Sequence, residues 1–158
     1  MKKIVLAAAL VALSSGSAFA ATATGSASAT VIAPITLTHT TNAVLAFGTF
    51  DAGTGGTVVV TTGGTGSATG NVTLVTGSSN SADNFTVGGD TNRTFAISTT
   101  GGTVVSGANS MSFTTTAPAT SALSGGAATF AVGGTLTVNS GQAAGSYTGS
   151  YSATVVYN

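Results

Sequence analysis

The sequence has no cysteine, no tryptophan and no glutamate, and charged residues make up only 4% of its 158 residues. Without cysteine no disulfide can form, so stability must come from packing or from contacts with other chains. Nucleic acid is not an expected partner, because binding to phosphates needs clustered lysine and arginine. Most catalytic mechanisms also lack their ionisable groups, so we expect a protein that is not an enzyme. What is abundant is glycine, threonine, serine and small apolar residues.

The first twenty residues have the pattern of a secretory signal peptide. Lys2 and Lys3 precede an apolar run over residues 4–13, and small residues lead to a cleavage site after Ala20. The run is about half the roughly 20 residues that a membrane span needs. We therefore expect cleavage of residues 1–20 and export through the periplasm to the cell surface or the medium. The mature chain keeps one arginine against three aspartates, a net charge of −2.

A strict alternation opens the predicted mature chain. Over residues 21–37 every odd position is small or apolar, and nearly every even position is serine or threonine. Such alternation places one face of an extended strand against apolar surroundings. Pro34 has no backbone N–H, so we divide the run near it into an N-terminal arm, residues 21–31, and the start of a domain, residues 32–158. The arm is predicted to be a donor strand with the inward residues Ala21, Ala23, Gly25, Ala27, Ala29 and Val31.

A second alternation ends the sequence. The residues on its apolar face are Tyr147, Gly149, Tyr151, Ala153, Val155 and Tyr157. The other face is polar except for Val156. The chain stops inside this predicted strand, so we expect a sandwich without its last strand, with a groove beside an unpaired edge. An unpaired edge accepts an added strand, and the arm of another copy has the matching pattern.

Between these two ends, short β-branched or aromatic runs alternate with glycine-rich breaks, and no segment has a helical period. This spacing favours an all-β antiparallel sandwich. The core is predicted to contain Phe47, Phe50, Phe85, Phe95, Phe113 and Phe130, while Asp51 is predicted to cap a turn. The longest irregular loop is expected over residues 117–126. The predicted strands are 22–33, 34–40, 44–47, 57–62, 69–76, 84–87, 93–99, 103–106, 111–115, 127–132, 134–139 and 146–157.

Several segments resemble the bacterial DUF4402 family. They are residues 31–38 (VIAPITLT), 45–49 (LAFGT), 133–138 (GGTLTV), 145–151 (GSYTGSY) and 155–157 (VVY). The same layout is similar to spore coat protein U-like subunits of archaic chaperone-usher pili, although the cysteines that often join early strands there are missing. The resemblance implies an incomplete immunoglobulin-like sandwich that the N-terminal arm of a neighbour completes. It also implies a periplasmic chaperone and an outer-membrane usher as partners.

Few residues could form a catalytic or metal site. His39 is the single histidine, and a lone imidazole does not make a zinc site, so we expect a surface or turn histidine. Nothing resembles a nucleophile elbow. Asp83 and Asp90 are predicted to form turns, and a calcium ion held by both is left open. The sequence thus assigns no catalytic, cofactor-binding or metal-ligating residue.

These patterns predict a structural subunit of a pilus or fibre, in which each arm completes the next copy of the chain. Head-to-tail insertion does not close on itself and therefore gives a filament. The main alternative is a monomeric secreted or adhesive module whose arm folds back into its own groove. Binding of ice or polysaccharide through ranks of threonine is a further alternative, as is a functional amyloid, but no fixed repeat supports the former.

Overall fold

The computed structural model describes residues 19–158, so the predicted signal peptide, residues 1–20, lies almost wholly outside the described residues. The described residues form thirteen β-strands and no helix. They divide into two units, residues 19–31 and residues 32–158. The strands are β1 (Thr36–His39), β2 (Phe50–Asp51), β3 (Gly56–Val60), β4 (Gly66–Gly70), β5 (Thr73–Leu74), β6 (Asp83–Gly88), β7 (Thr94–Thr100), β8 (Gly102–Ser106), β9 (Asn109–Thr116), β10 (Thr120–Ala122), β11 (Ala127–Val138), β12 (Thr148–Gly149) and β13 (Ser152–Tyr157).

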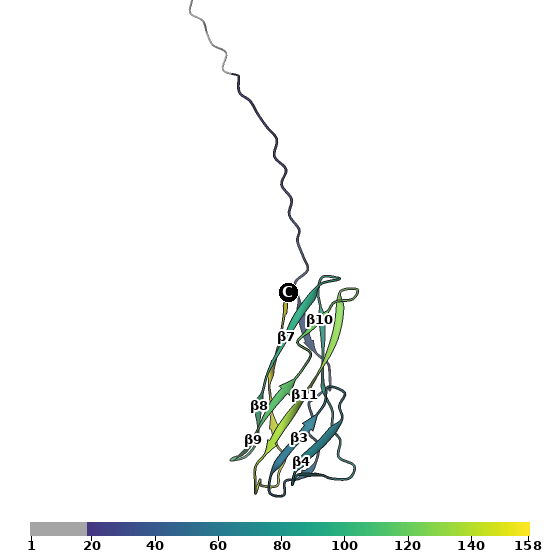
Figure 1. Ribbon diagram of the computed structural model, residues 1–158, viewed down its shortest axis with the longest axis vertical. Helices are drawn as coiled ribbons and strands as arrows, with labels where there is room; N and C mark the ends of the chain where they lie inside the picture. Colours follow the sequence, from purple (N-terminus) through teal and green to yellow (C-terminus); the bar gives the residue numbers. More distant parts are fainter. Residues whose placement is uncertain (1–18) are drawn as a thin grey trace, which may run out of the picture. The chain divides into compact units, whose positions relative to one another are not determined.

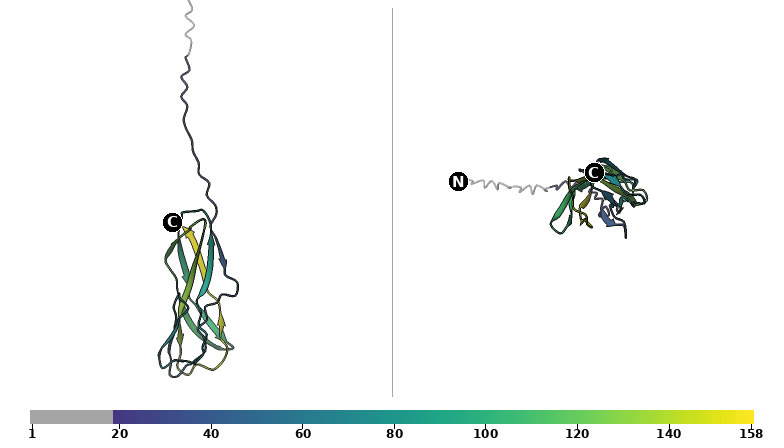
Figure 2. Two further views of the ribbon diagram at one scale, coloured as in Figure 1. Left: turned by 90° about the vertical axis from the view of Figure 1, so that its right-hand side faces the viewer. Right: turned by 90° about the horizontal axis from the view of Figure 1, so that it is seen from below.

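The strands of residues 32–158 form an antiparallel β-sandwich, which confirms the predicted fold class (Figure 1). The larger sheet has the order β1-β6-β11-β9-β8-β12, with β3 and β4 attached beside β11. The smaller sheet has the order β10-β7-β13, and β2 pairs with β5 separately. Seen end-on, the strands curve around a common interior (Figure 2). Residues 19–158 include no helix long and apolar enough to span a membrane.

Strand β11 holds the larger sheet together because it changes partner along its length. Its first half, Ala127–Val132, pairs with β6, and its second half pairs with β3 along the same edge. The change falls at Gly133, where a Cβ atom would lie 2.3 Å from the carbonyl oxygen of Val60. Glycine is therefore required by the close approach of another backbone. The two strands predicted over 127–132 and 134–139 are consequently one strand with a change of partner.

Two clusters of buried side chains form the core. The first, which we call the closed cluster, lies between the smaller sheet and strands β1, β6 and β11; its members are Phe85, Val87, Phe95, Ile97, Leu123, Phe130 and Val132. The second, which we call the grooved cluster, lies on β3, β9 and the second half of β11; its members are Phe47, Val58, Val60, Val72, Met111, Phe113, Leu136 and Val138. Five of the six predicted core phenylalanines are buried, and Phe50 is half-buried.

Several predicted elements differ from those observed. The strand expected over residues 22–33 is absent, since residues 19–35 carry no strand. An isolated strand has no partner for its backbone groups, and alternation alone does not supply one. The segment 117–126, predicted as a loop, contains β10, which pairs with β7. The long strand expected over residues 146–157 is divided into β12, which pairs with β8, and β13, which pairs with β7.

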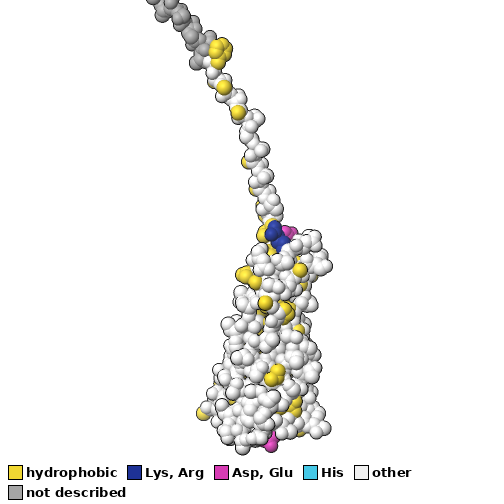
Figure 3. Space-filling view, viewed as in Figure 1, with side chains coloured by type: hydrophobic (Ala, Val, Ile, Leu, Met, Phe, Trp, Pro, Cys, Tyr) yellow, Lys and Arg dark blue, Asp and Glu magenta, His cyan; other side chains and the backbone are white. Residues whose placement is uncertain are grey.

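The outward surface of the larger sheet is covered by uncharged hydroxyl side chains. Thr57 lies opposite both Thr69 and Thr137, and Thr135 lies opposite Thr114. In the space-filling view, charged side chains gather in one small group at one end of the domain, with a further acidic side chain at the other end (Figure 3). The face seen there gives no charged patch that could attract a charged ligand.

Candidate functional site

The domain of residues 32–158 contains an open groove of about 1180 Å³. Its two walls are residues 43–52 and residues 142–151. Its floor consists of apolar side chains of the grooved cluster and its surroundings, namely Val104, Met111, Phe113 and Leu136. His39, Asp83 and Phe85 line one end. The groove therefore lies directly over a hydrophobic core, whose floor residues are largely buried and which half-buried side chains such as Leu45, Phe50 and Tyr147 border.

The first wall is held in place by residues 78–81. Ala46 and Ser81 form an isolated antiparallel bridge, and the Asn80 side-chain amide donates a hydrogen bond of 2.7 Å to the carbonyl oxygen of Phe47. Gly48 has a φ of 75°, and a Cβ atom there would lie 2.2 Å from Ser78 Oγ. The Phe-Gly pair is thus explained locally, because Phe47 is buried and Gly48 adopts a positive φ beside Ser78. These contacts hold the wall to residues 78–81 and leave its other side without a strand partner.

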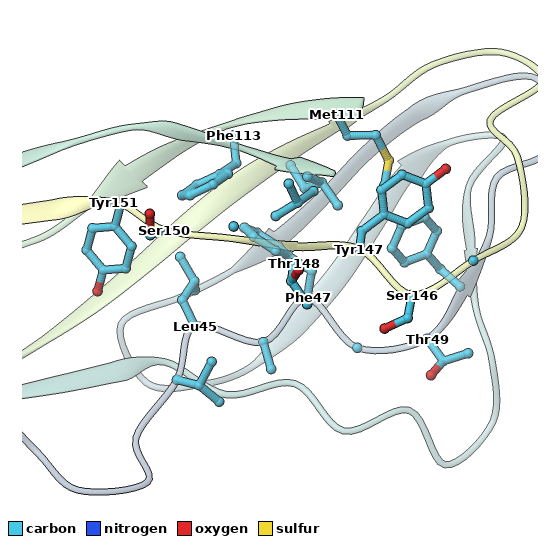
Figure 4. A pocket seen from close by; sticks show the side chains of 18 of the residues that line it. Leu45, Phe47, Thr49, Met111, Phe113, Ser146, Tyr147, Thr148, Ser150 and Tyr151 are labelled. Carbon is cyan, nitrogen blue, oxygen red and sulfur yellow. The ribbon is translucent and has the colours of Figure 1, made fainter. Parts of the chain in front are cut away.

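The second wall carries the predicted acceptor residues. Tyr147 and Tyr151 direct their rings into the groove, and Tyr147 lies beside Met111 (Figure 4). The Tyr147 hydroxyl donates to the carbonyl oxygen of Ala143 at 2.7 Å and accepts from Gln142 Nε2 at 2.8 Å. Gly149 lies where a Cβ atom would be 2.2 Å from the carbonyl oxygen of Thr103. The alternation of the sequence is therefore present as alternating inward and outward side chains.

The remaining predicted acceptor residues lie on β13 and are not among the residues that line the groove. Ala153, Val155 and Tyr157 are half-buried against the closed cluster. The Asn158 N–H donates to the carbonyl oxygen of Thr94, so the even-numbered residues of β13 bond to β7 in the alternating antiparallel pattern. The odd-numbered residues consequently direct their N–H and C=O groups away from β7. Within residues 19–158, β13 pairs with β7 alone, which leaves its outer edge free.

Strand β1 has a free edge as well. It pairs with β6 alone in the described part of the chain, and the Thr40 N–H donates to the carbonyl oxygen of Asn84. By the same alternation, Leu37 and His39 direct their backbone groups away from β6. Strands β1 and β13 come close to each other, and the Tyr157 hydroxyl donates to the carbonyl oxygen of Ala33 at 3.0 Å. The sandwich is thus closed at this end and open along the groove.

A buried carboxylate marks the closed end of the groove. Asp83 is only 5% exposed, and it accepts hydrogen bonds from His39 Nε2 at 2.6 Å, from the Tyr151 hydroxyl at 2.8 Å and from the Asn84 N–H at 2.8 Å. Burial raises the pKa of the Tyr151 phenol above its ordinary value, and the hydrogen bond and negative charge of Asp83 raise it further. Asp83 therefore joins the β1 side of the groove to the Tyr151 side.

This cluster corrects the prediction for Asp83. Asp83 does not form a turn, because it is the buried first residue of β6 and faces inward with Phe85 and Val87. The alternation of residues 83–88 was the signal that could have shown this. His39 is half-exposed at the end of β1, as expected for a surface histidine, and the sequence gives no sign of its hydrogen bond with Asp83.

A shared calcium site is also contradicted by the positions of the two carboxylates. Asp83 begins β6 and Asp90 follows its end, so strand geometry puts them on the order of 20 Å apart. Asp90 instead pairs with Arg93, at 3.0 Å between Oδ2 and Nε. The described residues hold no group of three or more histidine, cysteine or acidic side chains that could bind a metal ion.

The predicted donor residues lie in the other unit. Ala21, Ala23, Gly25, Ala27, Ala29 and Val31 are all exposed and belong to no strand. Their serine and threonine neighbours are exposed as well. Both faces of the arm are thus without a partner in the described residues, and the role of the arm stays a prediction.

Comparisons with known proteins give a family and nothing more specific. None of the curated proteins matches the chain, and none of the solved structures does. A model of the domain of unknown function DUF4402 matches residues 35–157, which is nearly the whole of the sandwich that contains the groove. The chain therefore belongs to the DUF4402 family.

Proposed function

We propose that the protein is a non-enzymatic structural subunit of a cell-surface pilus or fibre, assembled when the arm of one copy enters the groove of the next. The observation that carries the proposal is the groove itself, in which an apolar floor lies between two walls that do not pair with each other. A concave groove lined mainly by apolar side chains is typical of a binding site.

The arm has the chemistry that such a groove requires. Residues 21–31 alternate small apolar and hydroxyl side chains, and none of these side chains is charged. A strand added to a free edge gains main-chain hydrogen bonds, and its alternate side chains enter the groove. The small inward residues of the arm suit a groove that already contains the rings of Phe47, Tyr147 and Tyr151.

The proposal implies an export route and helper proteins. The predicted signal peptide takes the chain to the periplasm, where a chaperone has to cover the open groove before assembly. An outer-membrane usher then exports the subunits. These two partners follow from the resemblance to chaperone-usher subunits, and the open apolar groove beside free strand edges supplies a physical reason for the first of them.

A matched pair of arm variants tests the proposal in the mature chain, residues 21–158. Ala23→Asp places a charge on the predicted inward face, and Thr24→Asp places the same charge on the outward face. We expect the unaltered chain and Thr24→Asp to form SDS-resistant ladders and filaments, because an outward carboxylate remains in water. Ala23→Asp should stay monomeric, because its carboxylate would be buried without a partner. Light scattering and electron microscopy measure both.

Two outcomes would contradict the proposal. If the unaltered chain is a monomer at all concentrations, strands are not donated between copies, and the monomeric surface module takes its place. If both variants assemble equally well, or fail equally, the alternation of the arm does not govern assembly. Dependence of the ladders on protein concentration separates insertion into another copy from insertion of an arm into its own domain.

A further inference from the structure

The groove has two different ends. At one end, Asp83 is buried between His39 and Tyr151, and beyond it β1 and β13 come together. At the other end, the first wall ends near Asp51 of β2. The second wall begins with residues 142–146, which belong to no strand. One end is thus closed and contains a carboxylate, and the other is open.

The closed end fixes the direction in which an arm can enter. In each copy the arm joins its domain at Ile32, and β1 begins only four residues later. The donor domain is far too large to pass the closed end, so it must remain outside the open end. The arm then enters with Ala21 first, and Ala21 lies deepest in the groove.

The length of the arm agrees with this placement. On β11, Asp83 lies opposite Val132 and Gly56 lies opposite Val138. At about 3.3 Å per residue these levels are roughly 20 Å apart, whereas an extended arm of residues 21–31 spans about 35 Å. The arm is therefore long enough to reach Asp83 from the open end and to leave four or five residues, roughly, between the two domains.

The deepest group of such an arm is a cation. Cleavage after Ala20 leaves an α-ammonium group on Ala21, and residues 21–31 have no charged side chain. An ammonium group in an apolar groove is unfavourable by several kcal/mol unless an anion pairs with it. The Asp83 carboxylate accepts three hydrogen bonds, and a carboxylate has about four acceptor sites, so it can accept another.

We infer that the closed end of the groove is a binding site for the free α-ammonium group of the arm of another copy, with Asp83 as its anionic partner. The inference depends on the proposed function and on the predicted cleavage site. The site would fix the register of the arm, because insertion is complete when the ammonium group of Ala21 reaches the Asp83 carboxylate. It also gives a preference for arms that start at Ala21.

The composition of the chain allows the α-amino group to be modified selectively. Lys2 and Lys3 are the two lysines of the sequence, so the mature chain of residues 21–158 has one amine, its N-terminus. An acetyl ester of N-hydroxysuccinimide therefore removes the charge at that position alone. Reductive dimethylation modifies the same nitrogen but keeps the positive charge, and it is the matched control. Mass spectrometry verifies single modification, and light scattering gives the critical concentration for assembly.

We expect acetylation to raise the critical concentration at least about tenfold, because the buried carboxylate loses its cationic partner. Dimethylation should raise it much less. In assembled fibres the unmodified amine should be protected from the reagent. If the acetylated and unmodified chains assemble equally well, the ammonium site is wrong and the proposed function stands. If the unmodified chain does not assemble, both are wrong.

The variant Asp83→Asn identifies the partner of the amine. In this variant acetylation should have little further effect on the critical concentration, since interacting groups are not additive. An undiminished effect of acetylation would show that Asp83 is not the partner and would overturn the inference. The comparison of acetylated with dimethylated chains remains decisive even where Asp83→Asn fails to fold, because neither modification alters the domain.

Discussion

The two halves of the domain are built from the same residue types but differ in how completely they are covered. In the closed cluster, Val87, Phe95 and Val132 are fully buried between two sheets. In the grooved cluster, Val58 and Val60 are just as buried, and both clusters have half-buried apolar neighbours; the difference is that residues 43–52 and 142–151 leave a groove over the second cluster. The openness of the groove is therefore not a matter of hydrophobic content. It reflects a second layer made of two walls that do not meet.

The same strand serves both halves, which makes the comparison sharp. The first half of β11 is covered by the smaller sheet, and its second half faces the groove. Tyr151 packs against both clusters and so stands at the boundary. If the proposed function is right, we expect the closed half to contribute more to the stability of the monomer, while the grooved half receives a strand from another copy.

The largest effect is expected from a pair of phenylalanine substitutions, one in each half. Phe95→Ala removes a side chain that is 0% exposed and should lower the free energy of unfolding by about 3–5 kcal/mol. Phe50→Ala removes a half-buried ring from the groove wall and should cost about 1 kcal/mol. Urea denaturation of monomeric protein measures both. Equal losses would mean that the grooved half stabilises the monomer as much as the closed half does.

A second substitution acts where the halves meet. Gly133→Ala places a Cβ atom against the backbone of Val60 and should lower the free energy of unfolding by about 1–3 kcal/mol, because backbone cannot move aside as a flexible side chain can. Gly63→Ala is the control, since its Cβ atom would meet only Thr61 Oγ1 at 3.7 Å. If Gly133→Ala is as stable as the control, the strands around β11 adjust easily, and the halves are not held in a fixed relation.

The boundary residue Tyr151 gives a smaller effect that depends on pH. Tyr151→Phe removes a hydrogen bond to the buried Asp83 and should cost about 1–2 kcal/mol at neutral pH. The pKa of Tyr151 is raised in the folded state, so its contribution is present below the unfolded pKa of about 10 and is lost as the pH rises above that value.

Urea denaturation from neutral to alkaline pH checks this sign. The unaltered chain should lose stability above pH about 10 more steeply than Tyr151→Phe does. Tyr147→Phe, which changes the neighbouring ring of the groove and keeps Tyr151, should retain the steep loss. If Tyr151→Phe loses stability just as steeply as the unaltered chain, folding does not raise the pKa of Tyr151. The hydrogen bond between Tyr151 and Asp83 is then not the cause of the loss at alkaline pH.

The predictions from the sequence were correct where the signal is local. Alternation is a property of one strand, so the inward face of Tyr151, Ala153 and Val155 could be read directly. The turn-capping role of Asp51 was also predictable, and its carboxylate accepts a hydrogen bond of 3.1 Å from the Gly53 N–H. The all-β class follows from the same local patterns.

What the sequence does not contain is the choice of partner. Nothing in residues 127–138 shows that β11 leaves β6 for β3, because pairing joins residues far apart in the chain. For the same reason the apolar residues of the closed and grooved clusters could not be told apart. Asp83 was assigned to a turn from its residue type, although its alternation with Phe85 placed it inside. Alternation should be given more weight than residue type in such short strands.

The smallest effect is expected at the far end of the closed half, where Arg93 pairs with Asp90 and lies 5.9 Å from the centre of the Tyr157 ring. Both charged side chains are more than a third exposed, so water and salt weaken the pair. Arg93→Gln should lower the free energy of unfolding by at most about 1 kcal/mol, and by less at high sodium chloride. Urea denaturation at two salt concentrations measures this. Because the pair lies away from the groove, assembly should not change. A loss that is larger and independent of salt would mean that the closed half depends on charge at its end as well as on packing, and the contrast with the grooved half would then have a second cause.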